Sequence, residues 1–171
     1  MSTQELDPSI LDDFVQESLS LVDKCIELLE NIEQDPSEVE KLSEFANLID
    51  RVMGGAKSLA LGTSTEHALH LVGDYCAICK SVGYQGAKIQ NNDQLYSVCV
   101  ALLLDAVEMV KTLLSQVNMK RAELLKLFTT TFLDRMKWMS FQFDQIEKNS
   151  KGSVTKMQQN EIDDLLKKLG L

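Results

Sequence analysis

Apolar residues recur every three or four positions through most of this 171-residue sequence, and that spacing constrains the fold more than any other feature. It places the apolar side chains of each stretch on one face of an α-helix. Two prolines and 6% aromatic residues leave little material for the short strands and tight turns of a β-protein. The sequence therefore predicts an all-α protein. The expected helices cover residues 8–34, 36–61, 63–83, 92–117 and 119–148.

Signals for helix starts and stops fall at the ends of these stretches. Asp-Pro pairs at 7–8 and 35–36 place a capping aspartate before a proline in the first helical position. Thr63 and Glu66 have the spacing of a capping box, and Gly83 follows the last apolar residue of the third stretch. Residues 84–91 lack an amphipathic period, so we expect a loop between the third and fourth helices.

The connections between these helices are short, which favours an antiparallel up-and-down bundle. We expect one domain, residues 1–148, built as a four-helix core plus a long fifth helix. The small, polar residues 149–156 are typical of a linker. Residues 157–171 (MQQNEIDDLLKKLGL) form a flexible C-terminal tail whose apolar residues again have helical spacing. A helix this short needs a groove to bury its leucines, either on its own bundle or on a partner.

Charge and cysteine content restrict the partners and the compartment. The net charge is −9, and residues 1–50 alone carry 14 acidic and two basic residues. That acidic third repels nucleic acid and anionic membranes, so proteins are the better candidates for partners. The longest apolar run, Val98–Leu104, is too short to span a bilayer, and no leader sequence opens the chain. We expect a cytoplasmic protein whose four cysteines are reduced core residues.

Two adjacent glycines stand in the middle of the second helix, where each costs about 1 kcal/mol relative to alanine. They lie opposite the core-facing stripe, with Asp50 at the flank. This exposed side has a bare centre and a polar rim, which lets a neighbouring helix of the same bundle, or an external partner, approach closely. Its residues are Glu44, Asn47, Arg51, Gly54, Gly55 and Ser58.

The run LSEFANLIDRVMGGAKSLAL, residues 42–61, resembles the second helix of histidine phosphotransfer (HPt) domains, in particular the first domain of the chemotaxis kinase CheA. That family's motif is His-x-x-Lys-Gly-Ser/Gly-Ala. Residues 7–36 are similar to the family's acidic first helix, and residues 66–82 to its third. The resemblance implies a four-helix fold on which a response-regulator receiver domain docks.

This chain departs from the HPt motif at the reactive position. Alignment on the glycine pair puts Asp50 where the family has its phospho-accepting histidine, and Met53 where it has lysine. A carboxylate cannot form a phosphoramidate, so we expect no histidine phosphotransfer. The resemblance then implies a pseudo-HPt module that keeps the docking face. That face comprises Asp50, Arg51, Gly54, Gly55 and Ser58.

The tail carries a second resemblance. NEIDDLLKKLGL is similar to the C-terminal receiver-binding peptide of the chemotaxis phosphatase CheZ and to the N-terminal receiver-binding segment of the flagellar switch protein FliM. This implies a peptide that binds the phosphorylated form of a CheY-like response regulator. No cofactor is expected in this chain, since Mg²⁺ would belong to the receiver. The implied contact residues are Ile162, Asp163, Asp164, Leu165, Leu166 and Leu169.

An enzymatic alternative rests on an acid and an amide. Phosphatases of CheY-like proteins insert such a pair into the receiver, where the amide orients the attacking water. Glu44-x-x-Asn47 has the spacing seen in CheC and CheX, and Asp12-x-x-x-Gln16 has that of CheZ. We therefore keep open a CheZ-like phosphatase with Glu44 and Asn47 as catalytic residues. A helical assembly protein whose tail packs on its own bundle is the third hypothesis.

The remaining motifs receive structural interpretations. Cys76-x-x-Cys79 is expected to be a pair of buried thiols, so we predict no metal site, and His67 and His70 are expected on the polar face of the third helix. Trp138 and Phe141 lie off the main apolar stripe of the fifth helix. They are candidates for an exposed patch in docking or in a homo-oligomer.

Overall fold

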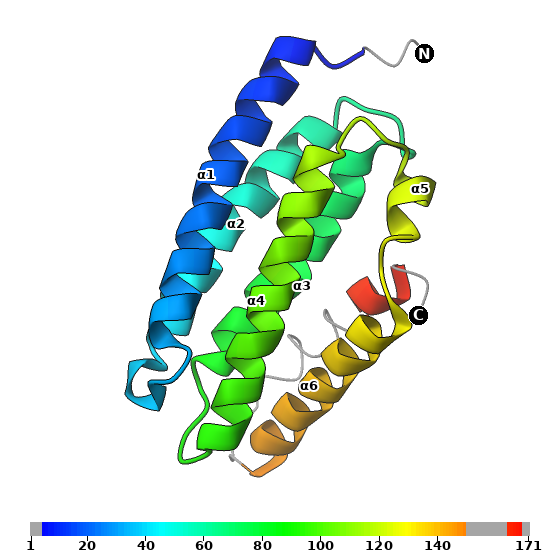
Figure 1. The fold of residues 1–171 in the computed structure, drawn as a ribbon. Helices are drawn as coiled ribbons and strands as arrows, with labels where there is room; N and C mark the ends of the chain where they lie inside the picture. Colours follow the sequence, from blue (N-terminus) through cyan, green and yellow to red (C-terminus); the bar gives the residue numbers. More distant parts are fainter. Residues whose placement is uncertain (1–4, 150–163, 169–171) are drawn as a thin grey trace.

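The computed structural model describes residues 5–149 and 164–168, and all regular elements in these ranges are helical (Figure 1). The all-α prediction is confirmed. The described residues contain no strand, only an isolated antiparallel bridge between His67 and Lys120. The elements are α1 (Pro8–Ile32), the 3₁₀ helix η1 (Pro36–Glu38), α2 (Lys41–Ala60), α3 (Ala68–Gly86), α4 (Asp93–Ser115), α5 (Arg121–Leu125) and α6 (Thr130–Asn149), followed by a short helical segment at 164–168.

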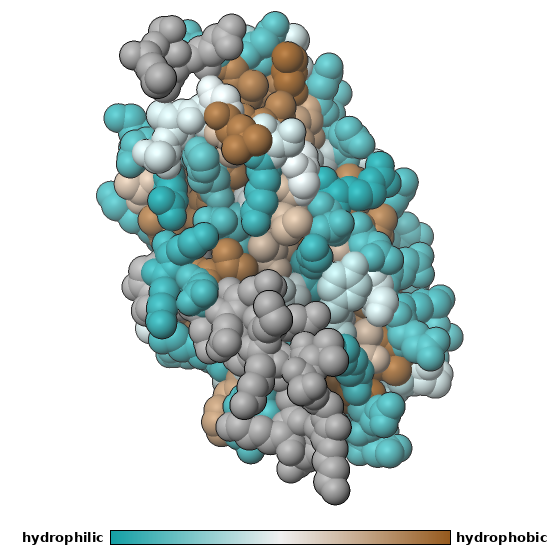
Figure 2. Space-filling model, turned by 180° about the vertical axis from the view of Figure 1, so that it is seen from behind, coloured by the Kyte–Doolittle hydropathy of each residue, from teal (hydrophilic) through white to brown (hydrophobic). Residues whose placement is uncertain are grey.

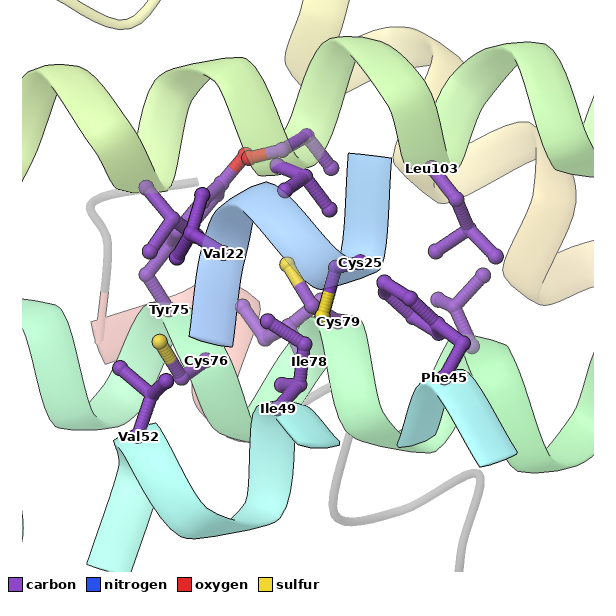
Figure 3. Packing of buried hydrophobic residues seen from close by; sticks show 14 of the residues in the cluster. Val22, Cys25, Phe45, Ile49, Val52, Tyr75, Cys76, Ile78, Cys79 and Leu103 are labelled. Atoms are coloured by element: carbon purple, nitrogen blue, oxygen red, sulfur yellow. The ribbon is translucent and has the colours of Figure 1, made fainter. Parts of the chain in front are cut away.

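Helices α1 to α4 lie side by side along their lengths (Figure 1). Helix α2 packs against α1 and α3, and α4 packs against the same two helices from the other side. The core therefore lies among all four. Figure 3 shows side chains from each helix meeting there, with Val22 and Cys25 from α1, Ile49 from α2, Cys79 from α3 and Leu103 from α4.

The starts of α1 and α4 follow the sequence signals. The Asp7 carboxylate accepts a hydrogen bond from the Ser9 amide at 2.9 Å, with Pro8 in the first turn. The Asn92 side chain accepts one from the Leu95 amide at 3.0 Å. Both bonds satisfy backbone donors that have no partner within the helix.

The predicted start of the second helix is wrong. Asp35 caps only the single turn of η1, and α2 begins at Lys41. Backbone bonds from Leu42 to Val39 and from Ser43 to Glu40 close tight turns there. The chain uses these residues to reverse direction between α1 and α2, so the Asp-Pro signal marks a turn rather than the helix start.

The predicted limits of the third helix are also wrong. Its N-cap is His67, not Thr63, and the helix continues through Gly83 to Gly86. A Cβ atom on Gly83 would lie 2.8 Å from the Phe45 ring, and one on Gly86 would lie 2.8 Å from the Cys99 sulfur. These glycines permit close helix packing instead of ending the helix, so residues 84–86 of the predicted 84–91 loop are helical and residues 87–91 form the connection.

The predicted fifth helix is divided into α5 and α6. At the break, the Thr129 hydroxyl accepts a hydrogen bond from the Phe132 amide at 3.2 Å. The change of direction lets Phe128 and Phe132 both reach the ring of Tyr75, at centroid distances of 5.2 and 6.1 Å. Aromatic packing on α3 thus accompanies the interruption of an otherwise continuous apolar period.

The four cysteines are free and buried, as predicted. Burial raises the pKa of Cys25, Cys79 and Cys99 to about 12. The buried hydroxyl of Tyr75 donates to the Ala106 carbonyl at 3.1 Å and so joins α3 to α4. The four cysteine thiols therefore act as small apolar residues of the core.

Candidate binding surface on helix α2

The side of α2 that faces away from the core carries the predicted docking residues. The helix buries its apolar stripe, and the polar residues between those positions therefore face outward. Figure 2 shows the molecule from behind, where hydrophilic residues predominate with apolar patches between them. We call the following set the α2 strip; Asp50 and Gly55 are half-buried and the others are exposed. It consists of Glu44, Asn47, Asp50, Arg51, Gly54, Gly55 and Ser58.

The two glycines have different surroundings. A Cβ atom on Gly54 would meet nothing within 4 Å, whereas one on Gly55 would lie 2.9 Å from Cε2 of Phe14 on α1. Gly55 is therefore explained by close packing inside the bundle. The open space over Gly54 is not used by any described residue. Of the pair, Gly54 alone presents bare backbone to an external partner.

Asp50, at the position of the family's histidine, is bound to a lysine of the next helix. The Lys80 ammonium lies 2.8 Å from Oδ1 of Asp50, and both side chains are partly exposed. The ion pair compensates part of the negative charge at this position. An ion pair this accessible to water contributes little to folding stability.

Glu44 and Asn47, the candidate phosphatase pair, both lie on the exposed side of α2. The Asn47 side-chain oxygen accepts a hydrogen bond from the hydroxyl of Tyr84. That bond fixes the amide and leaves its NH₂ group as the available donor. The sequence analysis missed both Tyr84 and Lys80 as partners. Their spacing of four residues on one helix face was the available signal, but it was hidden by the expected loop at 84–91.

Arg51 lies on the edge of the α2 strip nearest α1. Its guanidinium is 3.4 Å from Oε1 of Glu17, and both side chains are largely exposed. The pair is accessible to solvent, so Arg51 can exchange Glu17 for an acidic group of a partner at little cost.

The described part of the C-terminal peptide packs on the bundle beside the α2 strip. Leu166 is 4% exposed and belongs to the main apolar core, with Leu165 partly buried against it. The Arg121 guanidinium donates to the Lys168 carbonyl at 3.4 Å, which places the segment near α5 (Figure 1). Ile162, Asp163 and Leu169, like residues 150–156 of the predicted linker, lie outside the described residues.

A cavity of about 380 Å³ lies between this segment and helices α2 and α3. Helix α2 supplies an apolar and a basic side chain, and α3 supplies the lysine that pairs with Asp50. We call this space the α2–α3 groove. Its lining residues are Met53, Lys57, Ala77, Lys80, Ser81, Asp164, Leu165 and Lys168.

His70 lies with Asp74 and Ser81 on the partly exposed side of α3, as predicted, whereas His67 precedes the helix and forms its N-cap. Nδ1 of His67 accepts a hydrogen bond from the Leu69 amide at 3.1 Å, and Nε2 of His70 lies 3.3 Å from the Thr63 hydroxyl. Partial desolvation and the nearby His70 lower the pKa of His67. No group of three or more potential metal ligands occurs within the described ranges.

An exposed apolar patch lies on the α4–α6 side. Trp138 and Phe141 are 47% and 57% exposed, as predicted. Together with Val98 and Leu102, Trp138 lines a cavity of about 300 Å³, with Arg135 at its side. This patch is well separated in sequence and in the fold from the α2 strip.

Comparison of the chain with protein-family profiles, with characterised proteins and with solved structures gave no significant match. No helix in residues 5–149 or 164–168 is long and apolar enough to cross a membrane.

Proposed function

We propose that this chain is a cytoplasmic chemotaxis or two-component signalling protein that binds a phosphorylated CheY-like response regulator. In this proposal α1 to α4 are the up-and-down core of a pseudo-HPt domain, and residues 157–171 are a receiver-binding peptide. The observation that carries the proposal is the open space above Gly54, at the centre of an exposed polar strip. Bare backbone at this point allows a loop or helix of the receiver to approach α2 closely.

The chemistry at Asp50 favours binding without phosphotransfer. Its carboxylate is engaged with Lys80 and offers no imidazole to form a phosphoramidate. Phosphoryl chemistry, and the Mg²⁺ that supports it, would belong to the receiver. The chain itself contributes shape and charge, with Arg51 available to an acidic group beside the receiver's active site.

The tail gives the complex a second point of attachment. The linker that the sequence predicts at 149–156 would convert the second contact into an intramolecular step with an effective concentration on the order of mM. Two weak contacts, peptide and α2 strip, can thus give useful affinity although neither is tight alone.

The test is a titration of the full chain with a CheY-like receiver, in its phosphorylated and unphosphorylated forms. We expect the phosphorylated form to bind about tenfold more tightly, and Arg51→Glu to weaken that binding. Arg135→Glu is a matched control, because Arg135 is also exposed and is paired at 3.3 Å, to Asp105, on the α4–α6 side of the bundle. Absence of binding in both receiver states would refute the proposal.

The exposure of both Glu44 and Asn47 favours one further activity at the same surface, dephosphorylation of the receiver. In this reaction the Asn47 amide orients a water molecule that attacks phosphorus, the bond from phosphorus to the receiver's aspartate oxygen breaks, and inorganic phosphate leaves. The Glu44 carboxylate would accept the proton of the water. Asn47→Ala should abolish any acceleration of phosphate release while association persists, and unchanged turnover would exclude the pair.

A further inference from the structure

Residues 164–168 pack on the bundle with the same side chains that the resemblance assigns to receiver binding. Leu166 is buried in the core and Leu165 is partly buried, while Asp164 and Lys168 border the α2–α3 groove. An amphipathic peptide binds a partner by burying its apolar face. Leu166 cannot be buried in the bundle and in a receiver at the same time.

The location of the groove is a second reason why the docked peptide and a bound receiver would compete. A standard protein interface covers about 800 Å² on each partner, which is a patch of about 16 Å radius. In the groove, Met53 follows Asp50 by three residues and Lys57 follows Gly54 by three, so each pair lies on neighbouring turns of α2, about 5–6 Å apart. A receiver centred on Gly54 would therefore extend over residues 164–168.

From these two observations we propose that the α2–α3 groove is a docking site for the chain's own C-terminal peptide, and that a receiver must displace the peptide from it. This inference rests on the proposed function for the identity of the competitor. In the closed form the peptide is held by the groove and covers the flank of the α2 strip. In the open form both receiver-binding elements are accessible.

The contact is suited to reversible opening. Within residues 164–168 it consists of the buried Leu166, the partly buried Leu165 and one long hydrogen bond, from Arg121 to the Lys168 carbonyl. A closed form populated about 90% of the time lowers the apparent receiver affinity about tenfold, because only the open fraction binds. Weakening the groove side of the contact should restore that factor without changing the peptide sequence.

Ala77→Arg is the principal test, since Ala77 lines the groove on α3, is buried there, and lies outside the α2 strip. A guanidinium at this position would add a fourth positive charge beside Lys57, Lys80 and Lys168, and so repel the end of the docked segment. Ala101→Arg on the exposed side of α4 is the control. Hydrogen exchange of the full chain without receiver should become faster in residues 164–168 for the Ala77 variant only. The affinity for phosphorylated receiver should then rise about tenfold in that variant and stay constant in the control.

A milder variant guards against a folding defect in the Ala77 variant. Arg121→Ala removes the hydrogen bond to Lys168, and it should change both readouts in the same direction by a smaller amount. Hydrogen exchange should also show that adding receiver to the unmodified chain exposes residues 164–168.

The outcomes separate this inference from the proposed function. If the receiver binds the unmodified chain, the Ala77 variant and Arg121→Ala with the same affinity, the receiver-binding function stands and the competition is wrong. If slow exchange of residues 164–168 persists in the receiver complex, displacement is likewise wrong. If no variant binds a receiver in either state, the proposed function fails, and competition fails with it.

Discussion

Replacement of Gly54 separates folding from binding more cleanly than any other change in the α2 strip. No described residue lies within 4 Å of a Cβ atom at this position, so a methyl group here meets open space. Gly54→Ala in a helix interior should raise the free energy of unfolding by about 1 kcal/mol, because alanine loses less backbone entropy. For a chain of this size that is about 2–4 °C in Tm.

Gly54→Gln tests function with the same logic. Glutamine retains most of the gain in helix propensity but projects a long side chain into the space that a receiver would occupy. Overpacking a close contact costs about 1–3 kcal/mol, which is about five- to 150-fold in Kd. Thermal unfolding followed by circular dichroism gives the change in Tm, and titration with phosphorylated receiver gives the change in Kd.

Two controls accompany these variants. Gly55→Ala gains the same helix propensity but must displace the Phe14 ring from 2.9 Å, so its stability should fall below that of Gly54→Ala. Ala101→Gln introduces glutamine at an exposed site on α4 and should bind receiver normally. A raised Tm with unchanged receiver affinity in Gly54→Gln would refute the docking surface. A lowered Tm in Gly54→Ala would refute the open environment described for Gly54.

Three further predictions concern the fold. Gly83→Ala places a methyl group 2.8 Å from Phe45 and should lower the unfolding free energy by about 1–3 kcal/mol in a chemical denaturation experiment, whereas an unchanged midpoint would contradict the close packing. His67 has a lowered pKa and caps α3 as a neutral acceptor, so its contribution to stability is present above the ordinary histidine pKa and is lost as the pH falls through the lowered value. Thermal melts between pH 8 and 5 should therefore show a fall in Tm. His67→Asn should reduce this fall, because asparagine is a cap that does not titrate. The four buried thiols should not react with Ellman's reagent at pH 8 in the native chain and should all react in denaturant; fast labelling of the native form would contradict their burial.

Local signals in the sequence were sufficient for the fold class and for some helix ends. The caps of α1 and α4 depend on residues within two or three positions of the helix start, and periodicity identifies the buried stripe of each helix. The outward face of α2 follows from the same periodicity. These features are determined by neighbours along the chain.

The boundaries that were predicted wrongly depend on contacts between helices. A glycine such as Gly83 signals a helix end in isolation, yet here its missing side chain accommodates Phe45 of α2. The interruption before α6 likewise accompanies contacts of Phe128 and Phe132 with Tyr75. No helical wheel of a single segment contains this information.

In the candidate site too, some features follow from local sequence and others depend on contacts between helices. Its residues on α2 could be selected from one helix, but the partners that hold Asp50 and Asn47 come from α3. Their identity depends on the relative register of two packed helices. Sequence reasoning also left open whether the tail packs on its own bundle or on a partner. The burial of Leu166 shows that residues 164–168 pack on the bundle.

The tail can pack on its own bundle and also bind a receiver if its contact with the bundle is weak. The peptide always experiences its own groove at an effective concentration on the order of mM, whereas a receiver is present only at its own concentration. Burial of one leucine contributes about 1.5–3 kcal/mol, which corresponds to about ten- to 150-fold in an equilibrium constant before ordering costs are subtracted. A contact built on Leu166 can therefore favour the closed form while remaining open to displacement. Each further fully buried anchor would shift the balance by a similar factor. The strength of the contact between the tail and the bundle thus determines whether the tether promotes or prevents receiver capture.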